Sequence, residues 1–370
     1  MKSPTRHPMF QLLPIATLLC VVGGSSHVAA STIAQNVSWT IDRPESETTY
    51  RIVAYGDSIF AGYKGSISNV AIYAAPTVDG EYASNEWGTD VEIVRRAKSG
   101  AKAGDVYRSK IVDDASYMQT PETRVVAFEM CGNDALGARN DFSGQNGTCD
   151  FSRLDGALSK CTRFVRNAMV FINANAHANV KRKVISNLYY ASYDVDDTLT
   201  SCTDESTGLS VNKQDAFLPY LVRMNWRMCN FASEYGFECA DTFAEFMGAD
   251  YDSNGDRRKD TKALRYRQGE SEDDYVQRLT VTLRDTIRDA NFHFVRPSRS
   301  FDYLLSDDTH PTYRGRNVSL GLLGGSGGGS SEPRFTPAQY ERRRGKNPVW
   351  KKYGHERMGT EMSKFNPPAP

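Results

Sequence analysis

Short runs rich in β-branched and aromatic residues alternate along this chain with longer segments in which apolar residues recur at helical spacing. The short runs predict buried strands at Tyr50–Tyr55, Val91–Val94, Arg124–Met130, Lys183–Tyr189 and Phe237–Ala240. The longer segments predict helices at Ser152–Ala176, Gln214–Tyr235 and Asp273–Asn291. Strands that alternate with helices favour parallel pairing, so we expect a doubly wound α/β sheet.

Ser58, Gly100 and Asn133 each follow one of these predicted strands. In an open α/β sheet, ligands bind outside the carboxyl ends of the strands. The position of Ser58, in the segment VAYGDSIFAGYKG, therefore favours a nucleophile. The alternative for a Ser at such a position is a helix cap.

The N-terminal segment 1–30 has a basic start, a short apolar stretch and small residues, Val28 and Ala30, before Ser31. This order is typical of a secretory signal peptide. An uncleaved anchor is the alternative, but the apolar stretch is short for a membrane span. We therefore expect a secreted or periplasmic protein without a stable membrane span.

Charge and cysteine content agree with an exported globular protein. Lys plus Arg and Asp plus Glu are equal, at 45 each, so we expect no nucleic-acid partner. Beyond the signal segment the cysteines are Cys131, Cys149, Cys161, Cys202, Cys229 and Cys239. In an oxidising compartment these six predict three disulfide bonds, whose pairing among 15 connectivities the sequence leaves open.

A serine nucleophile needs a base, and the histidines beyond the signal segment are His177, His293, His310 and His355. His310 lies in LLSDDTHPTYRG, with Asp307 three residues earlier. On a tight loop, that carboxylate can accept the Nδ1–H of the imidazole and stabilise the imidazolium that forms during catalysis. Asp308 competes for this orienting role. We predict that His310 is the base and Asp307 its partner.

Donors for a developing oxyanion are available at the same strand ends. The backbone N–H groups of Ser58 and Gly100 and the side-chain amide of Asn133 would supply three donors from three strand ends. One such donor typically changes the rate by about a hundredfold to a thousandfold.

These blocks resemble those of the SGNH, or GDSL, hydrolase family in type and order, over roughly Tyr50 to His310. They read Gly56-Asp57-Ser58, Gly100, Cys131-Gly132-Asn133-Asp134 and Asp307-Asp308-Thr309-His310. The resemblance implies a flavodoxin-like three-layer α/β/α sandwich with a central parallel sheet. It also implies ester hydrolysis, with Ser58 as nucleophile, His310 as base, Asp307 as its orienter, and Ser58, Gly100 and Asn133 around the oxyanion.

The chain departs from the family at Cys131, which stands where the first Gly of Gly-x-Asn-Asp is usual. A disulfide-bonded Cys131 would clamp the loop that carries Asn133, whereas a free thiol would simply pack. A helix usually follows the Asp-x-x-His block directly, but here Gly-rich sequence intervenes. Neither departure removes a predicted catalytic group.

The chain is expected to consist of a signal peptide at 1–30, an SGNH hydrolase domain at 31–320, a Gly/Ser-rich and basic loop at 321–352, and a C-terminal segment at 353–370. Met358, Met362 and Phe365 share one helical face in the last segment. We predict that this segment is a helix that packs back on the domain, whereas a disordered tail is the alternative.

The segment GADYDSNGDRRKDTKAL has oxygen-bearing side chains at alternating positions, namely Asp250, Asp252, Asn254 and Asp256. This spacing suits a structural Ca²⁺ site, although Thr261 stands where a calcium loop has its bidentate Glu. An Asp/Asn/Gly-rich surface turn explains the pattern equally well.

Taken together, these features predict an exported serine esterase or lipase that forms an acyl-enzyme and needs no cofactor for chemistry. A lipid or lysophospholipid esterase and a carbohydrate O-acetyl esterase are alternatives within the family, so the ester substrate is a small molecule, a lipid or a carbohydrate. A catalytically inactive exported binding module is the alternative from another class.

Overall fold

A seven-stranded sheet is the centre of the part of the chain that this computed structural model describes. The described residues are 35–43, 45–66, 69–70, 72–189, 199–248, 260–287, 309–311, 334–335 and 354–368. They belong to one unit, Thr32–Pro370. In spatial order the strands are β11 (Glu238–Ala240), β8 (Arg182–Ser186), β6 (Thr123–Phe128), β2 (Thr49–Gly56), β5 (Asp90–Ala97), β1 (Asn36–Ile41) and β12 (Arg334–Phe335).

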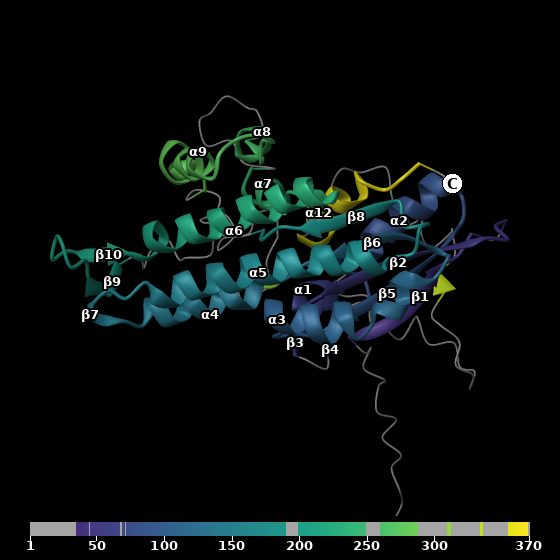
Figure 1. Cartoon of the computed structure of the whole chain (residues 1–370), viewed down its shortest axis with the longest axis horizontal. Coiled ribbons are helices and arrows are strands. Elements are labelled where there is room, and N and C mark those ends of the chain that lie inside the picture. The colour runs from purple at the N-terminus through teal and green to yellow at the C-terminus, as the bar shows by residue number, and fades with distance from the viewer. Residues whose placement is uncertain are drawn as a thin grey trace, which may run out of the picture. The chain divides into compact units, whose positions relative to one another are not determined.

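Five neighbouring strands of this sheet pair in parallel, namely β11, β8, β6, β2 and β5. Each of them overlaps a strand that the sequence predicts. Their order in the sheet is that of flavodoxin-like folds, in which the first strand lies between the second and the third. Both faces of such a sheet are covered, which is why residues 52–55 of β2 are apolar in succession and fully buried. The predicted fold class, a flavodoxin-like α/β/α sandwich, is therefore confirmed (Figure 1).

The sheet has an antiparallel edge that the sequence analysis did not predict. β1 pairs antiparallel with β5, and β12 lies parallel to β1 on its outer side. Trp39 and Ile41 on β1 are buried, and the polar Thr40 between them is buried as well, at 6% exposed.

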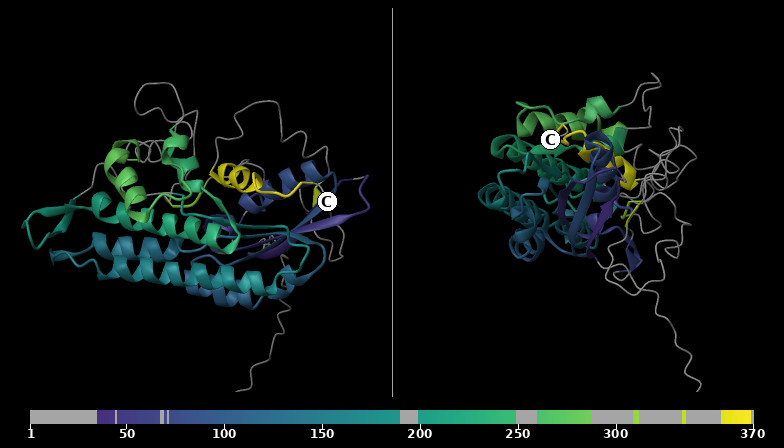
Figure 2. Two further views of the ribbon diagram at one scale, coloured as in Figure 1. Left: turned by 45° about the horizontal axis from the view of Figure 1, so that its top comes forward. Right: turned by 90° about the vertical axis from the view of Figure 1, so that its right-hand side faces the viewer.

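Helices cover both faces of the sheet (Figure 2). Because β5 and β6 lie on opposite sides of β2, right-handed crossovers place α2 on one face and α3, α5 and α6 on the other. α12 packs along α2, and α5 packs between α4 and α6. The helices are α1 (Ser58–Ala61), α2 (Ala75–Trp87), α3 (Ala103–Val106), α4 (Gly132–Ser143), α5 (Ser152–Asn175), α6 (Lys213–Tyr235), α7 (Thr242–Gly248), α8 (Thr261–Leu264), α9 (Glu272–Gln277) and α12 (Gly354–Ser363), with π-helical turns η1 (Tyr107–Val112) and η3 (Arg278–Thr282) and a 3-10 turn η2 (Ala115–Gln119).

Two predicted helices, Ser152–Ala176 and Gln214–Tyr235, correspond closely to α5 and α6. The side chain of Asn212 accepts hydrogen bonds from the first turn of α6, and Gly236 ends that helix with φ 71°. The predicted helix Asp273–Asn291 begins as α9 and continues as η3, and residues 288–291 lie outside the described residues.

Short strands form two further small sheets. β3 (Tyr63–Ser66) pairs with β4 (Asn69–Val70), directly after α1. β7 (Asn146–Thr148), β9 (Leu199–Thr203) and β10 (Ser210–Asn212) form a three-stranded sheet. The latter sheet lies at one end of the α4, α5 and α6 helices (Figure 1).

Three disulfide bonds are present, as the cysteine count predicts. Cys149–Cys202 ties the end of β7 to β9, and Cys229–Cys239 ties α6 to β11. Cys131–Cys161 joins the residue before α4 to α5. The alternative in which Cys131 is a free thiol is therefore wrong.

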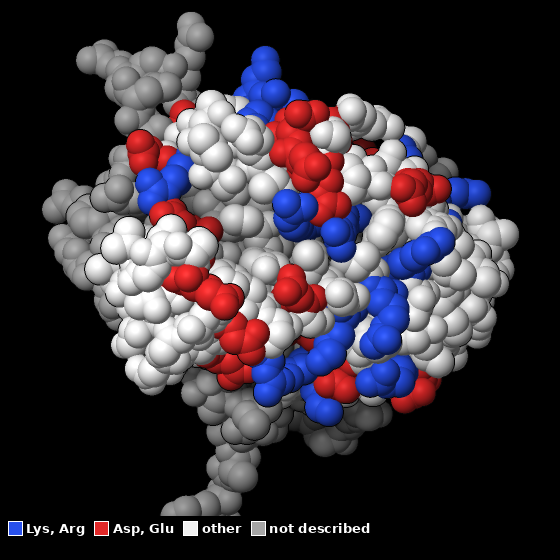
Figure 3. Space-filling view, turned by 60° about the vertical axis from the view of Figure 1, so that its left-hand side comes forward, with Lys and Arg blue, Asp and Glu red and all other residues white. Residues whose placement is uncertain are grey.

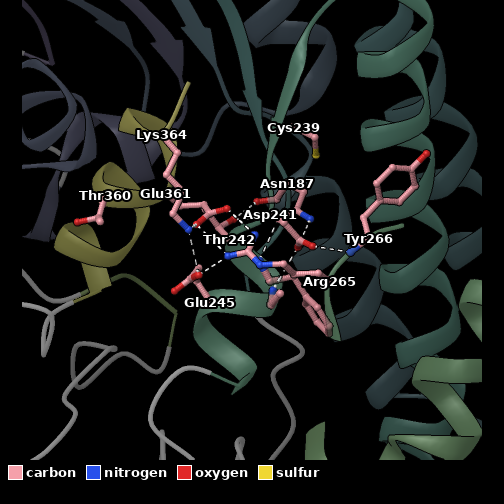
Figure 4. A network of polar contacts seen from close by, with 12 residues as sticks. Asn187, Cys239, Asp241, Thr242, Glu245, Arg265, Tyr266, Thr360, Glu361 and Lys364 are labelled. Carbon is pink, nitrogen blue, oxygen red and sulfur yellow. Dashed lines mark hydrogen bonds and ion pairs between the residues drawn. The ribbon is translucent and has the colours of Figure 1, made fainter. Parts of the chain in front are cut away.

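The C-terminal helix α12 is almost wholly buried, and Met358 and Met362 are each 1% exposed. Glu361 on this helix accepts a hydrogen bond from Arg265 at 2.7 Å. Glu245 on α7 accepts hydrogen bonds from Arg265 and, at 3.4 Å, from Lys364 just beyond α12 (Figure 4). It also accepts one from Arg357 on α12 at 3.1 Å. We call these five residues the α12 clamp, because they connect α12 to α7 and to the residue after α8.

Residues 1–34 lie outside the described residues, and so does most of 321–353. The predicted signal peptide and the Gly/Ser-rich loop therefore remain predictions. Within the described residues, no helix combines the length and the apolar character that a membrane span requires.

Candidate active site

Ser58 follows the carboxyl end of β2 and is the first residue of α1. Asp57 is the N-cap of α1, and its Oδ1 accepts a hydrogen bond from the Ile59 N–H at 2.9 Å. The cap is therefore Asp57, and the alternative in which Ser58 itself caps the helix is wrong. Ser58 is 5% exposed and lines a cavity at this end of the sheet.

His310 meets Ser58 across 252 residues of sequence, with Nε2 2.9 Å from the Ser58 Oγ. Tyr63 on β3 stacks on the imidazole, with ring centroids 4.0 Å apart and planes at 25°. The Tyr189 hydroxyl donates a hydrogen bond to the carbonyl of Thr309, the residue before His310. These two tyrosines hold the ring and its backbone, and the sequence analysis did not find either of them.

The other predicted member of the triad, Asp307, lies outside the described residues, as does its competitor Asp308. His293 also lies outside them. His177 accepts a hydrogen bond from the Asn179 N–H in the connection between α5 and β8. His355 is fully buried on α12, and burial, with His310 and Arg95 nearby, lowers its pKa to about 3.

Asn133 lies in the first turn of α4 and lines the cavity beside Ser58. Its Nδ2 donates hydrogen bonds to Asp57 Oδ2 and to the Ala101 carbonyl, both at 3.0 Å. An amide nitrogen has two donors, so both hydrogens of this group have acceptors within the protein.

Gly100 lies in the turn that leads from β5 to α3, with φ 76°, a left-handed conformation that glycine adopts without strain. Its neighbour Ala101 is the residue whose carbonyl accepts from Asn133. The residues that line the cavity include Ser58 and Asn133 but not Gly100. The structure thus joins the Gly100 turn to the Asn133 loop through Ala101.

Cys131, directly before α4, has φ 84°, the one positive φ of a non-glycine residue among the described residues. For a residue with a Cβ, the left-handed conformation costs about 1–2 kcal/mol. The disulfide to Cys161 on α5 ties this residue in place. The resemblance places a glycine here, and the positive φ explains why.

A carboxyl group that the sequence analysis missed lies beneath Ser58. Glu129 follows β6, is 5% exposed, and accepts a hydrogen bond from the Asp57 N–H at 2.5 Å. Burial and the charge of Asp57 raise the pKa of Glu129 well above its usual range. An acidic residue at the end of an otherwise apolar strand is the signal that could have revealed it.

The cavity beside Ser58 continues into a second, mainly apolar cavity. Leu136, Leu188, Tyr189 and Thr309 line both cavities, together with Gly132. The first cavity also contacts Met358 of α12, and the second extends to Phe217 and Leu221 on α6. An apolar path therefore leads from the Ser58 hydroxyl towards α6.

The predicted calcium ligands Asp250, Asp252, Asn254 and Asp256 lie outside the described residues. Among the residues that the structure does describe, no group of His, Cys, Asp and Glu side chains is arranged to hold a metal ion. The calcium site remains a prediction.

Charges of both signs are distributed over the surface. On the face in Figure 3, Lys and Arg side chains form a band, and Asp and Glu side chains gather in separate groups beside it. This mixture is consistent with the equal numbers of acidic and basic residues in the chain.

No protein-family model and no curated protein matches the chain. Solved structures similar to it include a lipase from a goat rumen metagenome, with 15% identity and a TM-score of 0.42 over 54% of this chain and 84% of that chain. A phospholipase A1 from Streptomyces albidoflavus has 20% identity and a TM-score of 0.39, over 54% of this chain and 83% of that one. An acetylxylan esterase from Geobacillus stearothermophilus has 12% identity and a TM-score of 0.35, over 64% of this chain and 94% of that one.

Proposed function

We propose that this chain is an exported serine hydrolase of the SGNH type that cleaves carboxylic esters through an acyl-enzyme. The observation that carries the proposal is the 2.9 Å contact between the Ser58 Oγ and the His310 Nε2. A hydroxyl at a strand end within hydrogen-bonding distance of an imidazole is the arrangement that activates a serine nucleophile. Its position at the carboxyl end of the sheet, beside a cavity, supports the same reading.

In the first half-reaction, the Ser58 Oγ attacks the ester carbonyl carbon while His310 Nε2 takes the hydroxyl proton. The carbon–oxygen bond to the leaving alcohol then breaks, and the imidazolium gives that proton to the alcohol oxygen. In the second, water attacks the carbonyl carbon of the acyl-enzyme while His310 Nε2 takes a proton from the water. The bond between that carbon and the Ser58 Oγ then breaks, the carboxylic acid leaves, and the imidazolium gives its proton to the Ser58 Oγ. Asp307, through the Nδ1–H, would orient the ring during both halves.

The Ser58 and Gly100 N–H groups and the Asn133 amide are the proposed donors to the oxyanion. Asn133 must exchange one acceptor to do so, because both of its N–H groups are engaged. The Ala101 carbonyl is the neutral acceptor of the two and therefore the weaker competitor for an oxyanion. The Asp57 contact would remain and fix the direction of the amide.

The apolar path from Ser58 to Phe217 and Leu221 favours an ester with an apolar acyl chain, such as a lipid, over a sugar acetate. The acyl group would extend between α4 and α6 because it is attached to the Ser58 Oγ in the intermediate. Export is supported by the signal-like segment 1–30 and by the three disulfide bonds, since such bonds persist in oxidising compartments. No cofactor takes part in the proposed chemistry.

The decisive experiment compares the purified protein with its Ser58→Ala variant on p-nitrophenyl acetate, butyrate and octanoate. We expect hydrolysis by the wild type, with kcat/KM rising from acetate to the longer chains. In Ser58→Ala, kcat should fall by a factor of about 10⁴ or more, because no nucleophile remains. Labelling by a fluorophosphonate should occur at Ser58 and disappear in the variant.

Ser233→Ala is a matched control, since Ser233 is an exposed serine on α6 whose hydroxyl accepts a hydrogen bond from Gln268 at 3.0 Å. Its rates should equal those of the wild type. A wild-type protein that neither hydrolyses an ester nor reacts with the probe would contradict the proposal. It would favour the alternative, a catalytically inactive binding module. A preference for acetate would contradict the assignment of an apolar acyl chain alone.

A further inference from the structure

Glu129 extends the parallel pairing of β6 with β2, because its N–H donates to the Tyr55 carbonyl at 3.0 Å. Its side chain turns under the segment Gly56–Asp57–Ser58. The Glu129 Oε1 accepts the Asp57 N–H at 2.5 Å. A Cβ at position 56 would lie 2.3 Å from the Glu129 Oε1. Gly56 is thus required because it leaves room for a buried carboxyl group.

Asp57 connects Glu129 to two parts of the proposed site, the turn that carries Ser58 and the loop that carries Asn133. Its two carboxylate oxygens accept from the Ile59 N–H at 2.9 Å and from the Asn133 amide at 3.0 Å. Donors on both oxygens suit an ionised carboxylate, which only accepts hydrogen bonds. Burial raises the pKa of Asp57, while the Ile59 N–H, Glu129 and His310 oppose that increase.

Asp57 and Glu129 are 1% and 5% exposed, and the Glu129 Oε1 lies 2.5 Å from the Asp57 nitrogen. Two buried carboxyl groups this close cannot both ionise cheaply, so one of them keeps a proton. Because Asp57 receives two donors and lies near His310, the proton belongs on Glu129. Among the described residues, the other titratable groups that act on the pair are His310, on the segment 309–311, and Asp134 on α4. His310 in turn lies near His355 on α12 and contributes to the lowered pKa of that buried imidazole.

We propose that Glu129 is a positioning residue that keeps one proton in the site and, through Asp57, holds both the Ser58 turn and the Asn133 amide in place. This inference rests on the proposed esterase function and adds a second condition to it. With the proton present, the pair carries one negative charge and Glu129 donates to Asp57. When the proton leaves, two adjacent carboxylates repel each other, and Asp57 no longer supports Ile59 and Asn133 in the same geometry.

The consequence is a reversible loss of kcat on the alkaline side, which comes from the geometry of the site and not from the base. His310 must be neutral to accept the Ser58 proton, so its ionisation removes activity on the acidic side. A second decrease of kcat, on the alkaline side of the pH profile, therefore reports the ionisation of a different group. Glu129 is the buried acid whose deprotonation would produce it.

Glu129→Gln separates this role from a purely structural one. Glutamine keeps an acceptor for the Asp57 N–H and a donor for the Asp57 carboxylate, but it cannot ionise. We expect kcat for p-nitrophenyl butyrate within about threefold of wild type at neutral pH, and the alkaline limb should be absent. In Glu129→Ala both contacts are lost, and kcat should fall about a hundredfold at every pH while KM changes little.

Glu361→Gln is the matched control, because Glu361 is a buried glutamate of the α12 clamp, outside the proposed site. Its pH profile should match the wild type. Rates are measured after subtraction of spontaneous hydrolysis, and each variant is checked by near-UV circular dichroism and by its unfolding midpoint. If Glu129→Ala does not fold, Glu129→Gln alone decides.

An unchanged alkaline limb in Glu129→Gln would overturn the proposal, and so would wild-type kcat in a folded Glu129→Ala. These outcomes differ from a failure of the esterase function itself. That failure would appear as a wild-type protein without ester hydrolysis and without labelling of Ser58.

Discussion

Two pairs of buried carboxyl groups in this protein have opposite surroundings. Asp57 and Glu129 face each other beneath Ser58, and burial raises the pKa of both. Glu245 and Glu361 in the α12 clamp are surrounded by Arg265, Arg357 and Lys364. Burial alone would raise the pKa of Glu245, but Lys364, Arg357 and Arg265 outweigh it and lower that pKa.

The difference teaches what each pair can do. Carboxylates that are paired with cations stay ionised and connect helices, as the clamp does between α7 and α12. Two carboxyl groups without such cations cannot both ionise cheaply, so the pair favours keeping one proton. Only in this second pair is the pKa of both carboxyl groups raised, and this pair lies next to the proposed nucleophile.

The largest effect that would sharpen this comparison is expected from Asp57→Asn. An asparagine places an N–H where Asp57 accepts from Ile59 or Asn133, so one donor of the site meets another donor. We expect kcat/KM for p-nitrophenyl butyrate to fall about a hundredfold, comparable with the loss of one oxyanion donor. Glu361→Gln, in the other pair, should leave kcat/KM within about twofold, which steady-state kinetics of both variants would check.

Equal losses of activity in the two variants would break the comparison. They would mean that the clamp and the Ser58 turn act on catalysis as one unit. Intact near-UV circular dichroism of each variant is the control for folding.

An effect of intermediate size is expected on the free energy of unfolding. Here a substitution in the α12 clamp should cost more than one in the Asp57–Glu129 pair. Glu245→Ala removes the acceptor of Arg265, Arg357 and Lys364, and Arg357 is only 4% exposed. Removing an acceptor from this buried guanidinium should lower the free energy of unfolding by about 2–4 kcal/mol. Urea titrations would measure this loss, and Glu129→Gln, which keeps its contacts, should lose less than about 1 kcal/mol.

The smallest effect is the pH dependence of stability, and its sign differs between the pairs. The pKa of Glu245 is lowered on folding, so its contribution is present above the unfolded pKa and is lost as pH falls through the folded pKa. The pKa of Glu129 is raised, so its contribution is present below the unfolded pKa and is lost as pH rises through the folded pKa.

Urea titrations at several pH values would detect both signs. Relative to wild type, Glu129→Gln should gain stability as pH rises, by at most about 1.4 kcal/mol per pH unit. Glu245→Gln should compare most favourably with wild type in acid. The same sign for both variants would contradict the protonation states described above.

Much of the fold could be predicted because its strands are buried on both faces. The five parallel strands appear in the sequence as short apolar runs, and α5 and α6 as apolar stripes at helical spacing. β1 escaped notice because half of its residues are polar, and an edge strand needs only one buried face. The pairing of β1 with β5 depends on contacts between segments, which no local pattern encodes.

The site was predictable where a residue lies beside a recognisable break in the pattern. Ser58 and Asn133 follow strand ends, and His310 lies in a short polar loop before a proline. Tyr63 has no such marker, and the marker of Glu129, an acidic residue at the end of an apolar strand, does not show which residue it contacts. Each contributes through a partner on another element, Glu129 through Asp57 and Tyr63 through the His310 ring.

The sequence by itself therefore determined the alternation of strands and helices, the polar residues at the strand ends and the even number of cysteines beyond residue 30. These are local properties, because they follow from side-chain type and spacing. Only the tertiary structure decided that Asp57 caps α1, that Cys131 pairs with Cys161, and that Glu129 lies against Asp57 beneath Ser58. Distances between segments, and the desolvation that moves a proton between two carboxyl groups, arise only when the chain packs.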